Sequence, residues 1–148
     1  MEKEERIEYA VSLHRNGFNC SQAVFVAFSD LYGIERELAL RLSAPFGGGI
    51  GRMRETCGAA CAMFMLAGLE NGPTVPKDLK GRAENYDLVQ ELAAEFKRRN
   101  GSICCGELLG LKKTAGETSV PPKRPCPKMV EEAARIFAEY LEKKNEIK

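Results

Sequence analysis

The sequence lacks the marks of two large functional classes. Lys and Arg number 22 and Asp and Glu 21, so the net charge is only +1. Nothing in this balance points to nucleic acid or an anionic membrane as the main partner. The most apolar stretch, residues 57–69, has 13 residues, whereas a membrane-spanning helix needs about 20. We therefore expect neither nucleic-acid binding nor membrane insertion.

The N-terminal residues do not resemble a signal peptide. The first ten residues, MEKEERIEYA, are charged from the second position and contain no apolar core. This predicts a cytoplasmic protein, in a compartment where thiols are kept reduced. The six cysteines then indicate catalysis, redox sensing or metal binding more than structural disulfides. The alternative is ordinary burial, since a free cysteine packs as a small hydrophobic side chain.

Strand signals are scarce, because alternating runs and clusters of β-branched residues are few. Apolar residues instead recur at helical spacing between cap and glycine signals. This pattern predicts helical segments over residues 2–15, 19–31, 35–43, 56–69, 80–99, 102–109 (a short one) and 127–143. A length of 148 residues suits one domain. We expect an all-α fold, a compact single-domain bundle of about five to six helices over residues 1–148.

Residues 45–55, PFGGGIGRMRE, separate the third and fourth segments and place four glycines within positions 47–51. We interpret this stretch as a turn that positions Cys57. The alternative is an anion site, because backbone N–H groups before a helix, with Arg52 or Arg54 nearby, attract negative charge. The stretch lacks the lysine of a P-loop, and no strand precedes it.

Four cysteines stand at or near predicted helix starts, which is the most informative feature of the chain. They are Cys20 after the cap Asn19, Cys57 after the candidate cap Thr56, Cys105 three residues past Ser102, and Cys126 as the cap before Pro127. Unpaired N–H groups and the macrodipole at a helix start favour a thiolate over a thiol. The thiolate is both the nucleophile and the metal ligand, so these positions predict thiol chemistry or a cysteine-liganded metal.

One helix start is not enough to make a thiol reactive. A free thiol with a pKa near 8.5 needs a shift of roughly 1.5 units, about 2 kcal/mol, to be mostly thiolate at neutral pH. An exposed helix terminus supplies about 0.3–1 kcal/mol. Several termini must therefore converge, or a cation must lie nearby. The candidate cations are Arg52 and Arg54 before Cys57, and Lys123, Arg124 and Lys128 around Cys126. The alternative for these is a solvated basic surface.

The remaining candidates have simpler explanations. Cys61 lies one helical turn after Cys57 and is interpreted as a core residue, and Cys104 adjoins Cys105. No CxxC pair links the four main cysteines, so any site must be assembled from distant segments. His14, the single histidine, could act as a base or ligand, but its place on the inner face of the first segment favours ordinary hydrogen bonding.

Several short motifs occur together along the chain. They are NCSQAV at 19–24, FGGGIGR at 46–52, ETCGAACA at 55–62, CGELLG at 105–110, and Cys126 before the last segment. In combination they resemble the family of small redox-active proteins named for its C_GCAxxG_C_C signature. The resemblance implies that Cys20, Cys57, Cys105 and Cys126 are the family's four cysteines. Ala62 departs from the signature, because the CGAxxG motif ends in glycine, and this departure concerns local packing more than chemistry.

We therefore expect thiol–disulfide redox chemistry, in which Cys57 or Cys20 attacks as a thiolate and a second cysteine resolves the mixed disulfide. The pairing stays open. The partner would be a protein or small-molecule thiol or disulfide, no cofactor would be needed, and the protein would act as a thiol–disulfide oxidoreductase. A second hypothesis is a metal-binding module, since four thiolates suit zinc or an iron–sulfur cluster. A third is a helical interaction protein with inert thiols.

Overall fold

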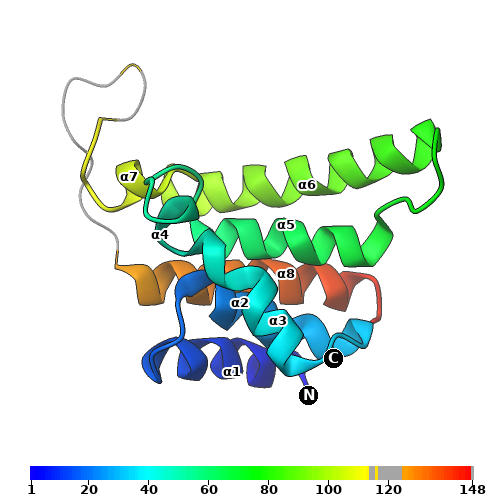
Figure 1. Ribbon diagram of the computed structural model, residues 1–148, viewed down its shortest axis with the longest axis horizontal. Coiled ribbons are helices and arrows are strands. Elements are labelled where there is room, and N and C mark those ends of the chain that lie inside the picture. The colour runs from blue at the N-terminus through cyan, green and yellow to red at the C-terminus, as the bar shows by residue number, and fades with distance from the viewer. Residues whose placement is uncertain (114–115, 117–124, 148) are drawn as a thin grey trace.

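The computed structural model describes residues 1–113, 116 and 125–147. Within these ranges the chain is helical and forms no strand (Figure 1), which confirms the all-α prediction. The elements are α1 (Lys3–Arg15), α2 (Cys20–Ser29), α3 (Arg36–Ser43), α4 (Gly47–Ile50), α5 (Gly58–Asn71), α6 (Leu79–Asn100), α7 (Cys105–Leu108) and α8 (Cys126–Lys143). Two 3₁₀ turns, η1 (Asp30–Tyr32) and η2 (Ala44–Phe46), flank α3.

The described residues contain seven regular helices, slightly more than the five to six expected. α4 is not counted among them, because Gly48 and Gly49 have φ values of 70° and 71° and so lie in the left-handed region. The excess comes from short elements such as α7, which has four residues. So short a helix is not stable alone, and contacts with other segments decide whether it forms.

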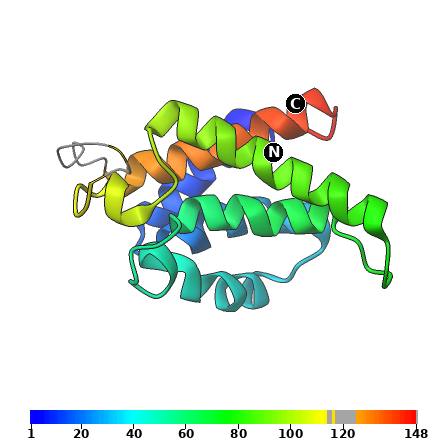
Figure 2. The ribbon, with the colours of Figure 1, turned by 90° about the horizontal axis from the view of Figure 1, so that it is seen from above.

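α5 lies at the centre of the bundle, as its almost wholly apolar sequence predicts. Its first six residues, 58–63, are all buried. α2 and α6 pack against it, and α8 packs against both α1 and α6 (Figures 1 and 2). Phe28 and Phe137 meet edge to face at 5.2 Å where α2 contacts α8. The buried side chains of these helices form one continuous core.

Local capping signals placed several helix ends correctly. Asn19 caps α2, because its side chain accepts from the Gln22 N–H at 2.9 Å while the Gln22 side chain accepts from the Asn19 N–H at 3.1 Å. Gly101 ends α6 with a φ of 90°. The start of α8 was predicted one residue late: Pro125 is the cap and Cys126 is the first helical residue. The residue before a proline is usually not helical, but here the Met129 N–H donates to the carbonyl of Pro125 at 3.3 Å and extends the helix to Cys126.

Two views show where the helix starts lie. α2, α5, α7 and α8 all begin at the same end of the molecule, and α4 lies at that end too (Figures 1 and 2).

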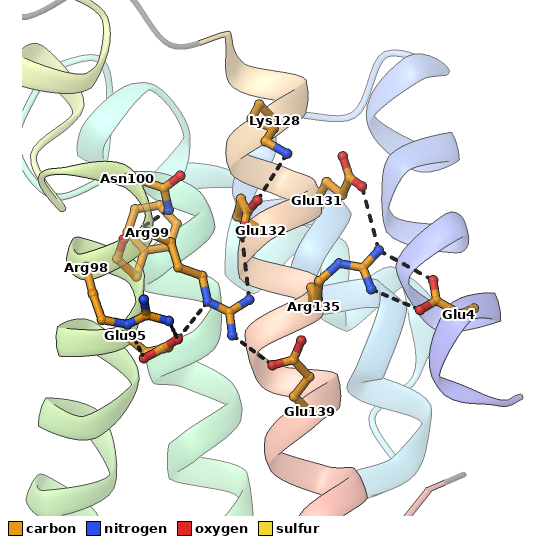
Figure 3. A network of polar contacts seen from close by, with 11 residues as sticks. Glu4, Glu95, Arg98, Arg99, Asn100, Lys128, Glu131, Glu132, Arg135 and Glu139 are labelled. Carbon is orange, nitrogen blue, oxygen red and sulfur yellow. Dashed lines mark hydrogen bonds and ion pairs between the residues drawn. The ribbon is translucent and has the colours of Figure 1, made fainter.

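Along the junction of α6 with α8, Arg99 bonds to Glu95 at 2.7 Å and Glu139 at 2.8 Å and lies 3.7 Å from Glu132 (Figure 3). In the described part of the chain, no helix combines the length and apolar character needed to cross a membrane.

Candidate functional site

All four cysteines singled out by the sequence line one small cavity. The cavity has a volume of about 40 Å³. Its wall is formed by Cys20, Gly48, Arg54, Cys57, Gly58, Cys105, Leu108, Leu109, Cys126 and Met129. Cysteines separated by up to 106 positions are thus brought to one place (20 to 126). This is the assembly from distant segments that the absence of a CxxC pair required.

The starts of α2 and α5 meet at Gly58. A Cβ on Gly58 would lie 2.6 Å from the Sγ of Cys20 and 2.6 Å from the carbonyl oxygen of Phe46. Both distances are far inside van der Waals contact, so glycine alone permits this approach. Because Gly58 directly follows Cys57, the close packing makes Cys20 and Cys57 neighbours.

Cys57 itself is the cap of α5, one residue later than the predicted cap, Thr56. Its backbone is not helical (φ −50°, ψ 131°). Its N–H donates to the carbonyl of Ile103 at 2.6 Å, outside the helix. The prediction was wrong because this bond joins segments that are far apart in the sequence.

The segments 54–57 and 103–106 pair in antiparallel fashion and place Cys105 beside Cys57. The Cys105 N–H donates to the carbonyl of Glu55 at 2.5 Å, and an isolated bridge joins Thr56 to Cys104. α7 therefore starts only at Cys105. The predicted segment started at Ser102, but Ser102 does not cap the helix. Its Oγ accepts from the Cys104 N–H at 2.9 Å and closes a turn instead.

The glycine-rich stretch forms a turn, as interpreted, and it packs directly beneath Cys105. Gly49 has a φ of 71°, and a Cβ there would lie 2.4 Å from the Cβ of Cys105 and 2.8 Å from the Cα of Arg54. Three other residues of the stretch, Ile50, Arg52 and Arg54, also have positive φ values, between 62° and 67°. Backbone strain of this kind, at residues other than glycine, is found most often at functional sites.

Several backbone donors in the second half of this turn are bonded to carbonyls within it, which leaves them unavailable for an anion. The N–H groups of residues 51, 52, 54 and 55 donate to the carbonyls of residues 45, 47, 48 and 49, in that order, at 2.8–3.4 Å. A donor already bonded to a carbonyl is not free to bind an anion.

Arg54 is the predicted cation that reaches a cysteine. Its Nη1 lies 3.7 Å from the Sγ of Cys105, in donor geometry, and Arg54 lines the cavity. Arg52 is exposed and is not part of the wall. Lys128 pairs with Glu132 at 3.1 Å. The two other candidates, Lys123 and Arg124, lie outside the described residues.

The expectation that a helix start favours the thiolate is wrong for Cys57. Burial raises the pKa of the Cys57 thiol to about 12. The N–H groups of Ala60 and Ala59 lower it, while negative charge on Cys20 and Cys105 would raise it. Loss of water therefore outweighs the helix terminus at this buried position, where only 6% of the residue is exposed.

The remaining sequence candidates, Cys61, Cys104 and His14, do not line the cavity. Cys61 is buried, as expected, with its Sγ 3.8 Å from the carbonyl of Thr56, and burial raises its pKa to about 11. Cys104 Sγ lies 3.4 Å from the carbonyl of Arg54. His14 is half-buried in α1 and does not line the cavity; burial lowers its pKa.

The described residues contain no group of three or more His, Cys, Asp or Glu side chains arranged to hold a metal ion. The cavity cysteines therefore share a wall without forming a ligand cluster. This geometry gives the four-cysteine zinc and iron–sulfur hypotheses no support.

Comparison with known proteins gives one match. The model of the family described as "Putative redox-active protein (C_GCAxxG_C_C)" matches residues 18–140, a range that contains all four cavity cysteines. No curated protein and no solved structure matches the chain.

Proposed function

The chain belongs to the C_GCAxxG_C_C family, and from this we propose that it is a thiol–disulfide redox protein whose working pair is Cys20 and Cys57. The observation that carries the proposal is the close packing of α2 against α5 at Gly58, which makes these two thiols neighbours in one cavity. We propose no resident cofactor for this cycle and place it in the cytoplasm, where the dithiol would be restored by other thiols.

The exposure of the two thiols suggests their roles. Cys20 is half-buried and begins a capped helix of ten residues, so it is the thiol that a substrate can reach. Cys57 is almost fully buried and its raised pKa keeps it protonated, so it is unsuited to the first attack that the sequence left open to either residue. The N–H groups of Ala59 and Ala60 face its sulfur and stabilise the charge it acquires as its proton leaves.

The cycle balances as a two-electron exchange. The Cys20 thiolate attacks a substrate disulfide, forming a mixed disulfide and releasing one substrate thiolate. Cys57 then attacks the Cys20 sulfur, and its proton is taken up by the departing substrate sulfur. The Cys20–Cys57 disulfide forms, the second substrate thiol leaves, and the substrate is reduced while the protein dithiol is oxidised. The substrate is a protein or small-molecule disulfide, and the reverse direction oxidises a dithiol.

The test is trapping of the mixed disulfide with oxidised glutathione. We expect the wild type to yield a Cys20–Cys57 disulfide, Cys57→Ser to accumulate glutathione on Cys20, and Cys20→Ser to yield neither. Cys104→Ser is the matched control and should behave as the wild type. Peptide mapping by mass spectrometry identifies each bond.

Two results would contradict the proposal. One is glutathione attached in Cys57→Ser to a cysteine other than Cys20. The other is stoichiometric zinc or iron in protein purified without chelator, lost on mutation of the cavity cysteines, together with thiols that do not exchange. The second result would favour a metal-binding module.

A further inference from the structure

We propose that Cys105, assisted by Arg54, is a second reactive thiol of the cavity, that it reduces small hydroperoxides such as hydrogen peroxide, and that it passes the oxidation to Cys57. The inference rests on the proposed function in one respect, since it gives Cys57 the same resolving role. It adds a substrate class and two residues that the thiol–disulfide cycle does not use.

Arg54 is held in place by unusual backbone geometry. Its φ is 62°, and its carbonyl accepts the Gly106 N–H at 3.1 Å and lies 3.4 Å from the Sγ of Cys104. These contacts fix the backbone, so that the guanidinium reaches the Cys105 sulfur at 3.7 Å. Backbone strain is retained mainly where function requires it, and here the positive φ of Arg54 serves to hold the guanidinium beside Cys105.

The charge of Arg54 is available to the thiol. Arginine stays protonated in proteins, and a cation beside a cysteine favours the thiolate. Within the described ranges Arg54 forms no ion pair with a carboxylate. Its positive charge is therefore directed at Cys105 and at whatever occupies the cavity beside it.

The size of the cavity selects the substrate. A volume of about 40 Å³ holds roughly three water-sized groups, enough for the two oxygens of hydrogen peroxide. A disulfide with its carbon substituents is much larger, and Cys105 is only 8% exposed. Besides cysteines and glycines, the wall holds the apolar side chains of Leu108, Leu109 and Met129, so among the wall side chains the guanidinium is the strongest donor of hydrogen bonds to the peroxide oxygens.

The reaction balances with the hydroperoxide as the oxidant. The Cys105 thiolate attacks one peroxide oxygen, an S–O bond forms, the O–O bond breaks, and the leaving hydroxide takes a proton to become water. Cys57 then attacks the sulfur of the resulting sulfenic acid. An S–S bond forms, the S–O bond breaks, and a second water leaves. The two thiols lose two electrons, which reduce the peroxide, and an external thiol restores the dithiol.

Cys57 is suited to join the two cycles. The pairing of segments 54–57 and 103–106 puts it beside Cys105, and the packing at Gly58 puts it beside Cys20. Negative charge on either of these cysteines would raise the pKa of the Cys57 thiol. A disulfide formed with Cys105 can therefore be transferred to Cys20, the more exposed thiol, for reduction by a partner.

The experiment adds hydrogen peroxide to the reduced full-length protein. We expect Cys20→Ser, which cannot transfer the disulfide to Cys20, to form a Cys57–Cys105 disulfide, and Cys57→Ser to accumulate a sulfenic acid on Cys105 that dimedone labels. Cumene hydroperoxide, which is too bulky for the cavity, should react at least tenfold more slowly. Sulfenic acid at another cysteine, or equal rates with both peroxides, would overturn the proposal.

Matched arginine variants test the role of the guanidinium. Arg54→Met keeps an unbranched side chain and the backbone strain but removes the guanidinium and its charge, and should slow the reaction with hydrogen peroxide at least tenfold. Arg52→Met lies in the same strained turn and should stay within twofold of the wild type. Arg54→Lys should give an intermediate rate, and it keeps the test valid if Arg54→Met does not fold. Equal rates for Arg52→Met and Arg54→Met would overturn the role.

A parallel reaction with oxidised glutathione separates this inference from the proposed function. Arg52→Met, whose side chain lies outside the cavity wall, should form the Cys20–Cys57 disulfide as fast as the wild type. Normal exchange with glutathione but no peroxide reactivity at Cys105 would remove the further inference alone. Peroxide reactivity at Cys105 without exchange at Cys20 would remove the proposed thiol–disulfide cycle alone.

Discussion

Two arginines in different parts of the fold have opposite surroundings. Arg99, between α6 and α8, pairs with Glu95, Glu132 and Glu139 (Figure 3). The bond to Glu139 raises its pKa most, and the bond to Glu95 also raises it. Arg54 faces the thiol of Cys105. Charge that is neutralised by carboxylates stabilises a helix junction, whereas charge that faces a thiol can change its reactivity.

The backbone is regular around Arg99 and strained around Arg54. Arg99 lies in the regular helix α6 and needs nothing unusual from its neighbours. Arg54 lies in a turn with a run of left-handed residues, packed against Cys105 through Gly49. The cysteine end of the molecule therefore depends on close backbone contacts, and the helix junction depends on side-chain ion pairs.

Gly49→Ala should have the largest effect, because it disrupts the close contact at the cysteine end. Its Cβ would lie 2.4 Å from the Cβ of Cys105 at a φ of 71°. We expect a loss of about 3 kcal/mol in the free energy of unfolding, measured with urea under reducing conditions. Gly33→Ala is the control, since Gly33 has a φ of 70° and no atom within 4 Å, and should lose about 1 kcal/mol. Equal losses would mean that φ strain alone matters.

Arg99→Met tests the helix junction. Removing the guanidinium leaves three partly buried carboxylates without their shared partner, so we expect a loss of about 2 kcal/mol in the free energy of unfolding. Lys80→Met, which removes an exposed pair with Glu84 at 3.9 Å, should cost a few tenths of a kcal/mol. The rate of disulfide formation with oxidised glutathione should not change in Arg99→Met. A slower rate would show that the two regions are coupled.

At neutral pH the smallest effect is that of Cys57 ionisation, which lowers stability only in alkali. The Cys57 thiol has a pKa of about 12 in the folded chain, against about 8.5 when unfolded. Below the unfolded pKa both states are protonated and the contribution is complete. As pH rises toward 12 only the unfolded thiol ionises, and stability falls by up to about 1.4 kcal/mol per pH unit.

Urea unfolding at pH 8 to 10 measures this slope. Cys57→Ala should have a shallower decline than the wild type because it removes one titrating thiol. Met129→Ala is the control, since it also loses packing at the cavity but removes no titrating group, and should keep the full slope. Identical slopes in both variants would show that Cys57 is not the source.

Local interactions explain which parts of the fold were predictable. The capping box of Asn19 and Gln22 spans three residues, so the sequence pattern contains the whole interaction. The apolar character of α5 is likewise a property of adjacent residues and predicted its burial. Thr56 was wrongly expected to cap α5 because the bond from Cys57 to Ile103 joins residues that no local pattern connects.

The candidate site shows the same division. The sequence motif shows a glycine after Cys57. It does not show that Gly58 makes room for the Cys20 sulfur, because this contact forms only when α2 packs against α5. Arg54 was one of five candidate cations, and its backbone conformation and the pairing of segments 54–57 and 103–106 singled it out. The signal available in the sequence was the glycine-rich turn just before it.

The sequence by itself determined that the chain is helical and which four cysteines belong together, since periodicity, caps and motifs are properties of neighbouring residues. Tertiary structure alone decided that these cysteines share one cavity, that Arg54 faces Cys105, and that Cys57 is protonated rather than charged. The physical reason is that distance between segments and exclusion of water arise only when the helices pack. A helix start favours a thiolate, but the burial that comes with packing reverses this preference at Cys57.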